Sequence, residues 1–197
     1  LTRTATTLSG TITMNTSEAL WLCLTFPLLP VEVFCRQETS AVVVISRQRV
    51  CSMNRPAQDI GIMPNSSMST AYTISDHVVC FERNESKELK SLKHLAQWSY
   101  QFTPSVSLEP PNSLLLNISG CLKLFGGLRN LKNTIQRQLN AQGYTVMVGV
   151  NGTPLAALCS AAAILNDNTG DVRRSLLNVP THQLHIDDLT INQLQQI

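Results

Sequence analysis

The sequence predicts an α+β fold in which a β-sheet is covered by helices. Hydrophobic residues make up 43% of the chain and charged residues 14%, a composition that supports a packed core and argues against disorder. Short apolar and β-branched runs alternate with stretches of helical period, as strands and helices do. The order strand, helix, strand, helix in the second half, with an apolar second strand, predicts a sheet covered on one face.

The first half of the chain predicts short elements. Residues 1–19 are rich in Thr and Ser without an apolar period, which is typical of a flexible leader. Val31–Cys35 fits either a short helix or an extended turn. The expected strands are Leu20–Leu24, Ala41–Ile45, its antiparallel partner Val50–Met53, and Val78–Phe81, and the expected helices are Pro56–Ile60 and Ser67–Ile74.

The second half predicts longer helices. One runs from Asn84 or Ser86 to about Tyr100, with an apolar stripe formed by Leu89, Leu92, Leu95 and Ala96. The remaining expected elements are strand Ser113–Ile118, helix Leu128–Ala141, strand Tyr144–Val150, helix Pro154–Leu165, a helical piece at Arg173–Asn178 and a last helix capped by Thr190.

Charge and cysteine usage narrow the class of protein only slightly. A net charge of +2 is weaker than the basic signature usual for duplex-DNA binders, so it argues neither for nor against nucleic acid. The six cysteines include no CxxC pair and the histidines complete no zinc-ligand spacing, so free thiols in a reducing cytosol are expected.

The apolar stretch Leu20–Cys35 contains Pro27 and Pro30 and is too short to span a bilayer.

Four stretches carry a family resemblance. They are LWLCLTFPLLPVEVF (20–34), RPAQDIGIMPNSSMSTA (55–71), FTPSVSLEPPNSLLLNISG (102–120) with LKLFGG (122–127), and YTVMVGVNGTPLAALCSAAA (144–163). In order and spacing they resemble the UmuC-type, Y-family DNA polymerase domain, and FTP, SLEPP and LFGG together are similar to its ImuB subgroup. The resemblance implies a palm from residues 20–26 and 80–170, built as a ferredoxin-like sheet with helices. It also implies a small fingers insertion at 27–79 and the truncated start of a helical thumb at 171–197.

The resemblance also implies where a polymerase would hold its two magnesium ions. Family members place one Asp on the first palm strand and an Asp-Glu pair at the start of a later strand. Cys23 stands at the first position, and Asn112 and Ser113 stand at the pair. Because Mg²⁺ requires anionic oxygen ligands, we expect no metal, no cofactor and no catalysis here. The alternative is an active enzyme with Mg²⁺ in which Glu109, in a shifted register, supplies a carboxylate.

The nucleotide-binding positions implied by the resemblance have changed as well. Arg55 and Gln58 stand where family members hold the triphosphate with a Tyr and an Arg. Leu28 replaces the sugar-selecting aromatic residue, and Leu158 replaces a phosphate-binding Lys. Loss of both sets of ligands predicts a nucleotide site that is no longer used.

Basic residues in the second half offer a different surface. No acidic residue lies between Pro110 and Asn166, whereas four basic residues do: Lys123, Arg129, Lys132 and Arg137. These residues could contact a DNA backbone weakly, or they could form the solvated face of an outer helix.

By resemblance, the expected function is that of a non-catalytic adaptor in bacterial DNA-damage-induced mutagenesis. Its partners would be a RecA-like ImuA protein, an error-prone C-family DNA polymerase and the β sliding clamp, bound mostly through regions beyond this chain, in the cytoplasm and without a membrane. The segment QLQQI (193–197) is similar to a clamp-binding peptide but lacks its terminal aromatic residue, and it suits a buried thumb helix better. The rival hypotheses are an active Y-family translesion polymerase using Glu109 and an unrelated α/β protein.

Overall fold

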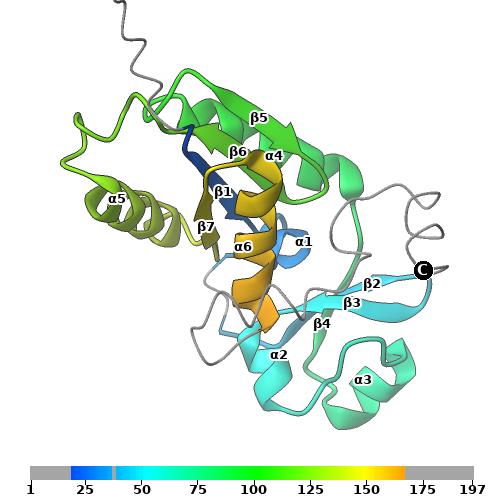
Figure 1. The fold of residues 1–197 in the computed structure, drawn as a ribbon. Coiled ribbons are helices and arrows are strands. Elements are labelled where there is room, and N and C mark those ends of the chain that lie inside the picture. Colours follow the sequence, from blue (N-terminus) through cyan, green and yellow to red (C-terminus); the bar gives the residue numbers. More distant parts are fainter. Residues whose placement is uncertain (1–18, 37–38, 167–197) are drawn as a thin grey trace, which may run out of the picture.

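The computed structural model describes residues 19–36 and 39–166, which form two β-sheets with helices around them (Figure 1). The four-stranded sheet has the order β5–β6–β1–β7, and every neighbouring pair in it is antiparallel. Its strands are β1 (Trp21–Thr25), β5 (Val106–Glu109), β6 (Ser113–Asn117) and β7 (Met147–Asn151). The three-stranded sheet has the order β3–β2–β4, and its strands are β2 (Val42–Ser46), β3 (Arg49–Met53) and β4 (Val79–Glu82).

The four-stranded sheet has the ferredoxin-like arrangement. Along the chain, β1 is followed by α4 (Glu85–Ser99), β5, β6, α5 (Leu128–Ala141) and β7. This is the β-α-β-β-α-β order of that motif, with the first and third strands at the centre of the sheet. The predicted α+β class and ferredoxin-like sheet are therefore confirmed.

Helices cover both faces of the four-stranded sheet, so the prediction of a single covered face was wrong. Leu22 and Leu24 of β1 face α4 and α5 in the main core. The alternate residue Cys23 packs against Ala157 and Ala161 of α6 (Pro154–Asn166) on the other face. Because α6 is apolar around most of its circumference, its sequence did not indicate which face it would cover.

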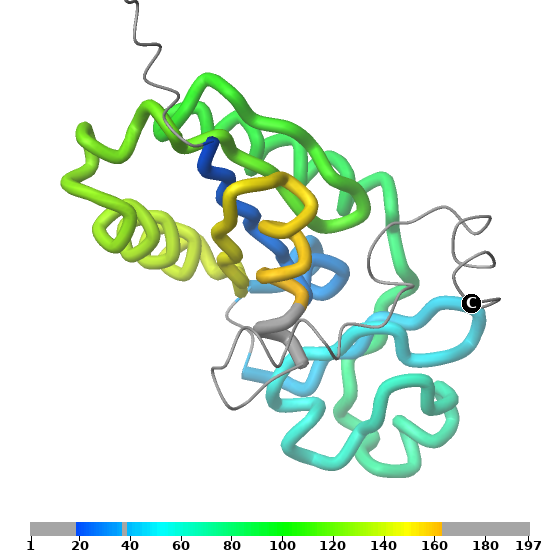
Figure 2. The backbone as a smooth tube through the Cα atoms, viewed as in Figure 1, coloured from blue at the N-terminus to red at the C-terminus, as the bar shows by residue number. Residues whose placement is uncertain are grey.

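The three-stranded sheet forms an excursion between β1 and α4, visible as the cyan to green part of the tube at the lower right of Figure 2. It carries three short helices, α1 (Leu29–Glu32), α2 (Arg55–Asp59) and α3 (Met68–Ile74). The Asn54 side chain caps α2 by accepting from Ala57 N, and the Ser67 side chain caps α3. β4 pairs in parallel with β2, so this sheet extends to Glu82, slightly past the predicted fingers segment 27–79.

An ion pair lies where the chain returns to the four-stranded sheet, and it alters the predicted face of α4. Arg83 donates two hydrogen bonds, of 2.9 and 2.8 Å, to the Glu88 carboxylate, which is almost fully buried. The backbone N–H of Arg83 also donates to Ile45 O of β2. Glu88 therefore takes the inner position next to Leu92, whereas Leu89, predicted in the apolar stripe, is 39% exposed.

The remaining predicted elements within the described residues are present, with ends shifted by a few positions. The open choice at Val31–Cys35 is resolved as the single helical turn α1. β5 had not been predicted. The leader, the helical piece at Arg173–Asn178 and the thumb helix after Thr190 lie outside the described residues. Among the helices of residues 19–36 and 39–166, none has both the length and the apolarity of a bilayer span.

Candidate functional site

The residues at the metal-ligand positions meet on the face of the four-stranded sheet that α6 covers. Thr25 of β1 is paired with Ser113 of β6, and Ser113 is paired with Glu109 of β5. Directly paired residues of antiparallel strands project to the same face, and so do residues two apart on one strand. Thr25, Ser113 and Glu109 therefore form one cross-strand row, and Cys23 lies on the same face in the next row, opposite Leu115.

A chain of hydrogen bonds links these polar groups. The hydroxyls of Thr25 and Ser113 are 3.0 Å apart, and Cys23 Sγ lies 3.5 Å from Thr25 Oγ1. Ser113 Oγ donates to Asn112 Oδ1 at 3.4 Å, and Asn112 Nδ2 donates to Phe26 O at 3.3 Å. Thr25 thus connects Cys23 to Ser113 and Asn112. The side chains of this network satisfy one another's hydrogen-bonding groups, and none of them is charged.

The Cys23 thiol is neutral under ordinary conditions. Its side chain is completely buried beneath α6. Burial raises the pKa of this thiol to about 11; a hydrogen bond with Thr25 opposes the shift, and the negative charges of Glu109 and Cys159 add to it. Because only a thiolate is an effective cysteine ligand or nucleophile, Cys23 is chemically inert at neutral pH.

This donor set does not fit a pair of magnesium ions. Thiol, hydroxyl and amide groups stand where anionic oxygens are required. Glu109, a carboxylate on the same face, accepts a hydrogen bond of 3.0 Å from Ser107 Oγ on its own strand. In the described parts of the chain, no three His, Cys, Asp or Glu side chains are grouped as metal ligands.

Thr25 is the member of the network that sequence reasoning missed. It stands two residues after Cys23 at the end of β1, one residue past the predicted strand Leu20–Leu24. The two-residue period of a strand puts both side chains on one face, so this signal was available. Its pairing with Ser113 depended on the register between two strands that lie far apart in the sequence.

The predicted nucleotide-binding positions do not converge on one site. Leu28 and Arg55 line a common pocket of about 220 Å³ between α1, α2 and the turn before β7. The Arg55 side chain is 88% exposed and lies 3.9 Å from Asp59. Gln58 is exposed on α2, whereas Leu158 packs on α6 beside the Cys23 cluster.

A buried carboxylate lines the same pocket. Glu32 Oε1 accepts a hydrogen bond of 2.7 Å from Thr145 N, which ties α1 to the turn before β7. Glu32 Oε2 is buried with no protein hydrogen-bond partner among the described residues. Burial raises the pKa of this carboxyl, although its hydrogen bonds with Thr145 and the charge of Arg36 oppose the shift.

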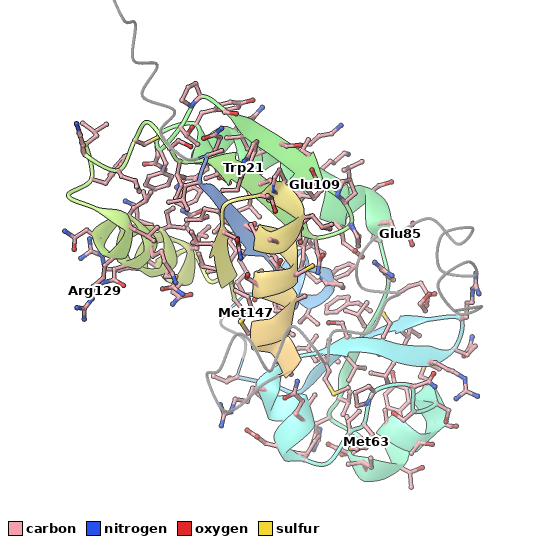
Figure 3. All side chains as sticks on the ribbon, viewed as in Figure 1. Trp21, Met63, Glu85, Glu109, Arg129 and Met147 are labelled. Carbon is pink, nitrogen blue, oxygen red and sulfur yellow. The ribbon has the colours of Figure 1, made fainter. Side chains whose placement is uncertain are left out.

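The predicted basic residues lie on the other side of the four-stranded sheet. The inner side of α5 packs in the core with α4, on the face opposite Cys23, while Arg129 is exposed and Lys132 is half-buried outside that inner side. These two residues line a shallow pocket of about 440 Å³, and Figure 3 labels Arg129 on α5, well away from Glu109. Lys123 lies in the turn before α5, and Arg137 is exposed further along the helix.

The fold is that of solved Y-family polymerases. It is similar to a ternary complex of Dbh (TM-score 0.59, 15% identity, 72% of this chain and 44% of that chain). It is also similar to DinB from Sulfolobus solfataricus (TM-score 0.55, 16% identity, 72% and 45%) and to a Y-family DNA polymerase chimera of Dbh and Dpo4 (TM-score 0.55, 15% identity, 72% and 45%). The chain therefore spans less than half the length of these proteins and shares their palm-like α+β architecture.

Sequence comparison gives the family. No curated protein matches the sequence. Residues 31–162, about two thirds of the chain, match the IMS family, described as impB/mucB/samB. The matched stretch begins within α1 and ends within α6, and so includes Asn112 and Ser113 but not Cys23. The chain belongs to the impB/mucB/samB family and contains its Y-family polymerase-like domain.

Proposed function

We propose that this domain is a non-catalytic, ImuB-type adaptor derived from a polymerase. It would act in the bacterial cytoplasm in the response to DNA damage, translesion synthesis and induced mutagenesis. There it would connect a RecA-like ImuA protein, an error-prone C-family polymerase and the β sliding clamp. The family and fold support a polymerase-like domain, and the partners rest on the ImuB-like stretches of the sequence.

One observation carries the non-catalytic half of the proposal. The groups at the expected metal-ligand positions hydrogen-bond to one another as a neutral network, from Cys23 through Thr25 to Ser113 and Asn112. Two adjacent magnesium ions repel each other, and several carboxylates are needed to compensate for that repulsion. The neutral side chains here would also bind each ion only weakly. Phosphoryl transfer depends on such ions to neutralise the developing charge, so this site lacks the main source of catalysis.

The position of Glu109 favours a second candidate, an active Y-family polymerase with a shifted site. Glu109 is the direct cross-strand partner of Ser113 and shares the face of Cys23. Among the described residues, it is therefore the acidic group placed to bind a metal ion near the expected site. Against it, a single carboxylate leaves the second metal ion without an anionic protein ligand.

Primer extension separates the two candidates. The wild-type protein and Glu109→Ala are each given a primer-template, the four deoxynucleotides and Mg²⁺, with an active Y-family polymerase as positive control. We expect no template-dependent product from either protein. Extension by the wild type that disappears in Glu109→Ala would refute the non-catalytic function.

The adaptor half needs its own experiment. The purified protein is titrated separately with the ImuA protein, the C-family polymerase and the β clamp from the same organism, and binding is followed by surface plasmon resonance. Binding to at least one of them is expected, and no binding to any of the three would refute a direct contribution of this domain to the adaptor's contacts. Weak DNA binding through Lys123, Arg129, Lys132 and Arg137 stays a prediction.

A further inference from the structure

Helix α5 carries a positively charged pocket, and two of the residues considered above for weak DNA binding line it. Five residues of the helix line it: Leu128, Arg129, Lys132, Asn133 and Gln136. The ion pairs among the described residues all involve other side chains. No described acidic residue therefore neutralises Arg129 or Lys132. The first turn of α5 also contains no acidic residue. The pocket thus presents uncompensated positive charge, which is complementary to an anionic ligand.

The composition of the pocket indicates what kind of anion it fits. An Arg side chain can bind a carboxylate through two parallel hydrogen bonds, and a Lys can bind a second one. The amides of Asn133 and Gln136 both donate and accept, as the backbone of an extended peptide requires. Leu128 adds an apolar contact at one end. This mixture of charge, amide and aliphatic surface is typical of peptide recognition.

Nucleic acid is a poorer match for the same surface. Two cations in the pocket are few for a phosphate backbone, whose binding usually involves a row of such contacts. None of the described residues that line the pocket is aromatic, so they offer bases no stacking platform. A primer end at the metal-ligand positions would lie on the α6 side of the four-stranded sheet, the face opposite α5.

We propose that this pocket on α5 is a docking site for an acidic peptide segment of a partner protein. The segment carries at least two carboxylates, which pair with Arg129 and Lys132. It lies along the outer face of a helix whose inner face, formed by Leu131, Ile135 and Leu139, is fixed in the core. Because this surface lies on the opposite face of the sheet from Cys23, docking there does not depend on whether the protein lacks catalysis.

The test uses fluorescence anisotropy with three labelled probes, a short poly-glutamate peptide, a single-stranded oligothymidylate and a short DNA duplex. The variant Arg129→Ala/Lys132→Ala removes the two cations from the pocket. Its matched control, Lys90→Ala/Lys93→Ala, removes the same charge from the exposed side of α4. Circular dichroism checks that both variants keep the wild-type helix content.

We expect the wild type to bind the peptide more tightly than either nucleic acid at the same salt concentration. The pocket variant should lose about tenfold or more in peptide affinity, because two charge-assisted contacts are removed. The control should change by less than about twofold, as expected for exposed distant charges. The proposal is overturned if the two variants weaken binding equally, if the wild type does not bind the peptide, or if a nucleic-acid probe binds more tightly and depends on Arg129 and Lys132.

Discussion

The close contact between α6 and β7 makes Gly149→Ala the sharpest test of the fold around the site. Gly149 is paired with Cys23 across β1 and β7 and lies directly beneath α6. A Cβ atom at this position would lie 2.3 Å from Ala157 O and 2.4 Å from Ala161 N. Both are backbone atoms of a helix, so neither can move aside as a flexible side chain would.

The size of the effect follows from these distances. Ordinary contact with a Cβ begins near 3.4 Å, so α6 must shift by about 1 Å, which also loosens its packing on Cys23 and Leu115. Overpacking of this kind costs about 1–3 kcal/mol, and rigid backbone neighbours favour the upper end. For a chain of this size, about 3 kcal/mol lowers the Tm by roughly 6–12 °C.

The assay is thermal unfolding followed by circular dichroism, with Gly152→Ala as the matched control. A Cβ at Gly152 would meet only Ala19 O, at 3.7 Å, so this variant should melt within about 2 °C of the wild type. Hydrogen exchange should be faster in α6 of Gly149→Ala but unchanged in α5. A Tm of Gly149→Ala equal to the wild type, or equal destabilisation by Gly152→Ala, would refute the proposed close packing.

Three further changes probe other features. Burial raises the pKa of Glu32, so the contribution of Glu32 to stability should be greatest below the pKa of an unfolded Glu and should be lost as the pH rises through the folded pKa. Glu32→Gln should therefore show a smaller fall in the free energy of unfolding with rising pH than the wild type does, in urea unfolding between about pH 4 and 8. The β2–β3 turn holds Arg47 and Gln48 at φ 51° and 66°, so Arg47→Asn/Gln48→Gly should raise the free energy of unfolding by about 1 kcal/mol, and no gain would contradict a strained turn. Cys23→Asp should lose about 3 kcal/mol or more because it buries an unpaired carboxylate, whereas Cys23→Ser should lose about 1 kcal/mol; equal losses in urea unfolding would contradict the burial of this position.

The success of the sequence-based fold prediction depended on how clearly each element shows its period. α5 was predicted with the correct ends because Leu131, Ile135 and Leu139 recur every four residues and glycines flank the helix. β5 was missed because it is a short edge strand with little burial, set between Pro104 and Pro110. An apolar helix such as α6 shows no polar face, so its period could not predict which side of the sheet it covers.

The sequence indicated candidate residues for the site, but it did not indicate how their side chains are connected. Family-like spacing located Cys23, Asn112 and Ser113, and strand parity was sufficient to place Thr25 beside Cys23. The contact between Thr25 and Ser113 joins residues 88 positions apart. Tertiary packing sets the register of β1 against β6, and no local sequence pattern encodes that register.

The neutral network and the apolar α6 depend on each other physically. A carboxylate at Cys23 would need water or metal ions on this face, whereas Ala157 and Ala161 exclude both by packing on the thiol. Conversely, a helix as apolar as α6 can lie against this face because Thr25 and Ser113 satisfy each other's hydroxyl groups there. Placing carboxylates at Cys23, Asn112 and Ser113 alone would therefore bury repelling charges under an unchanged helix. Under the proposed function, a metal site here would require a different α6 as well as three different side chains at these positions.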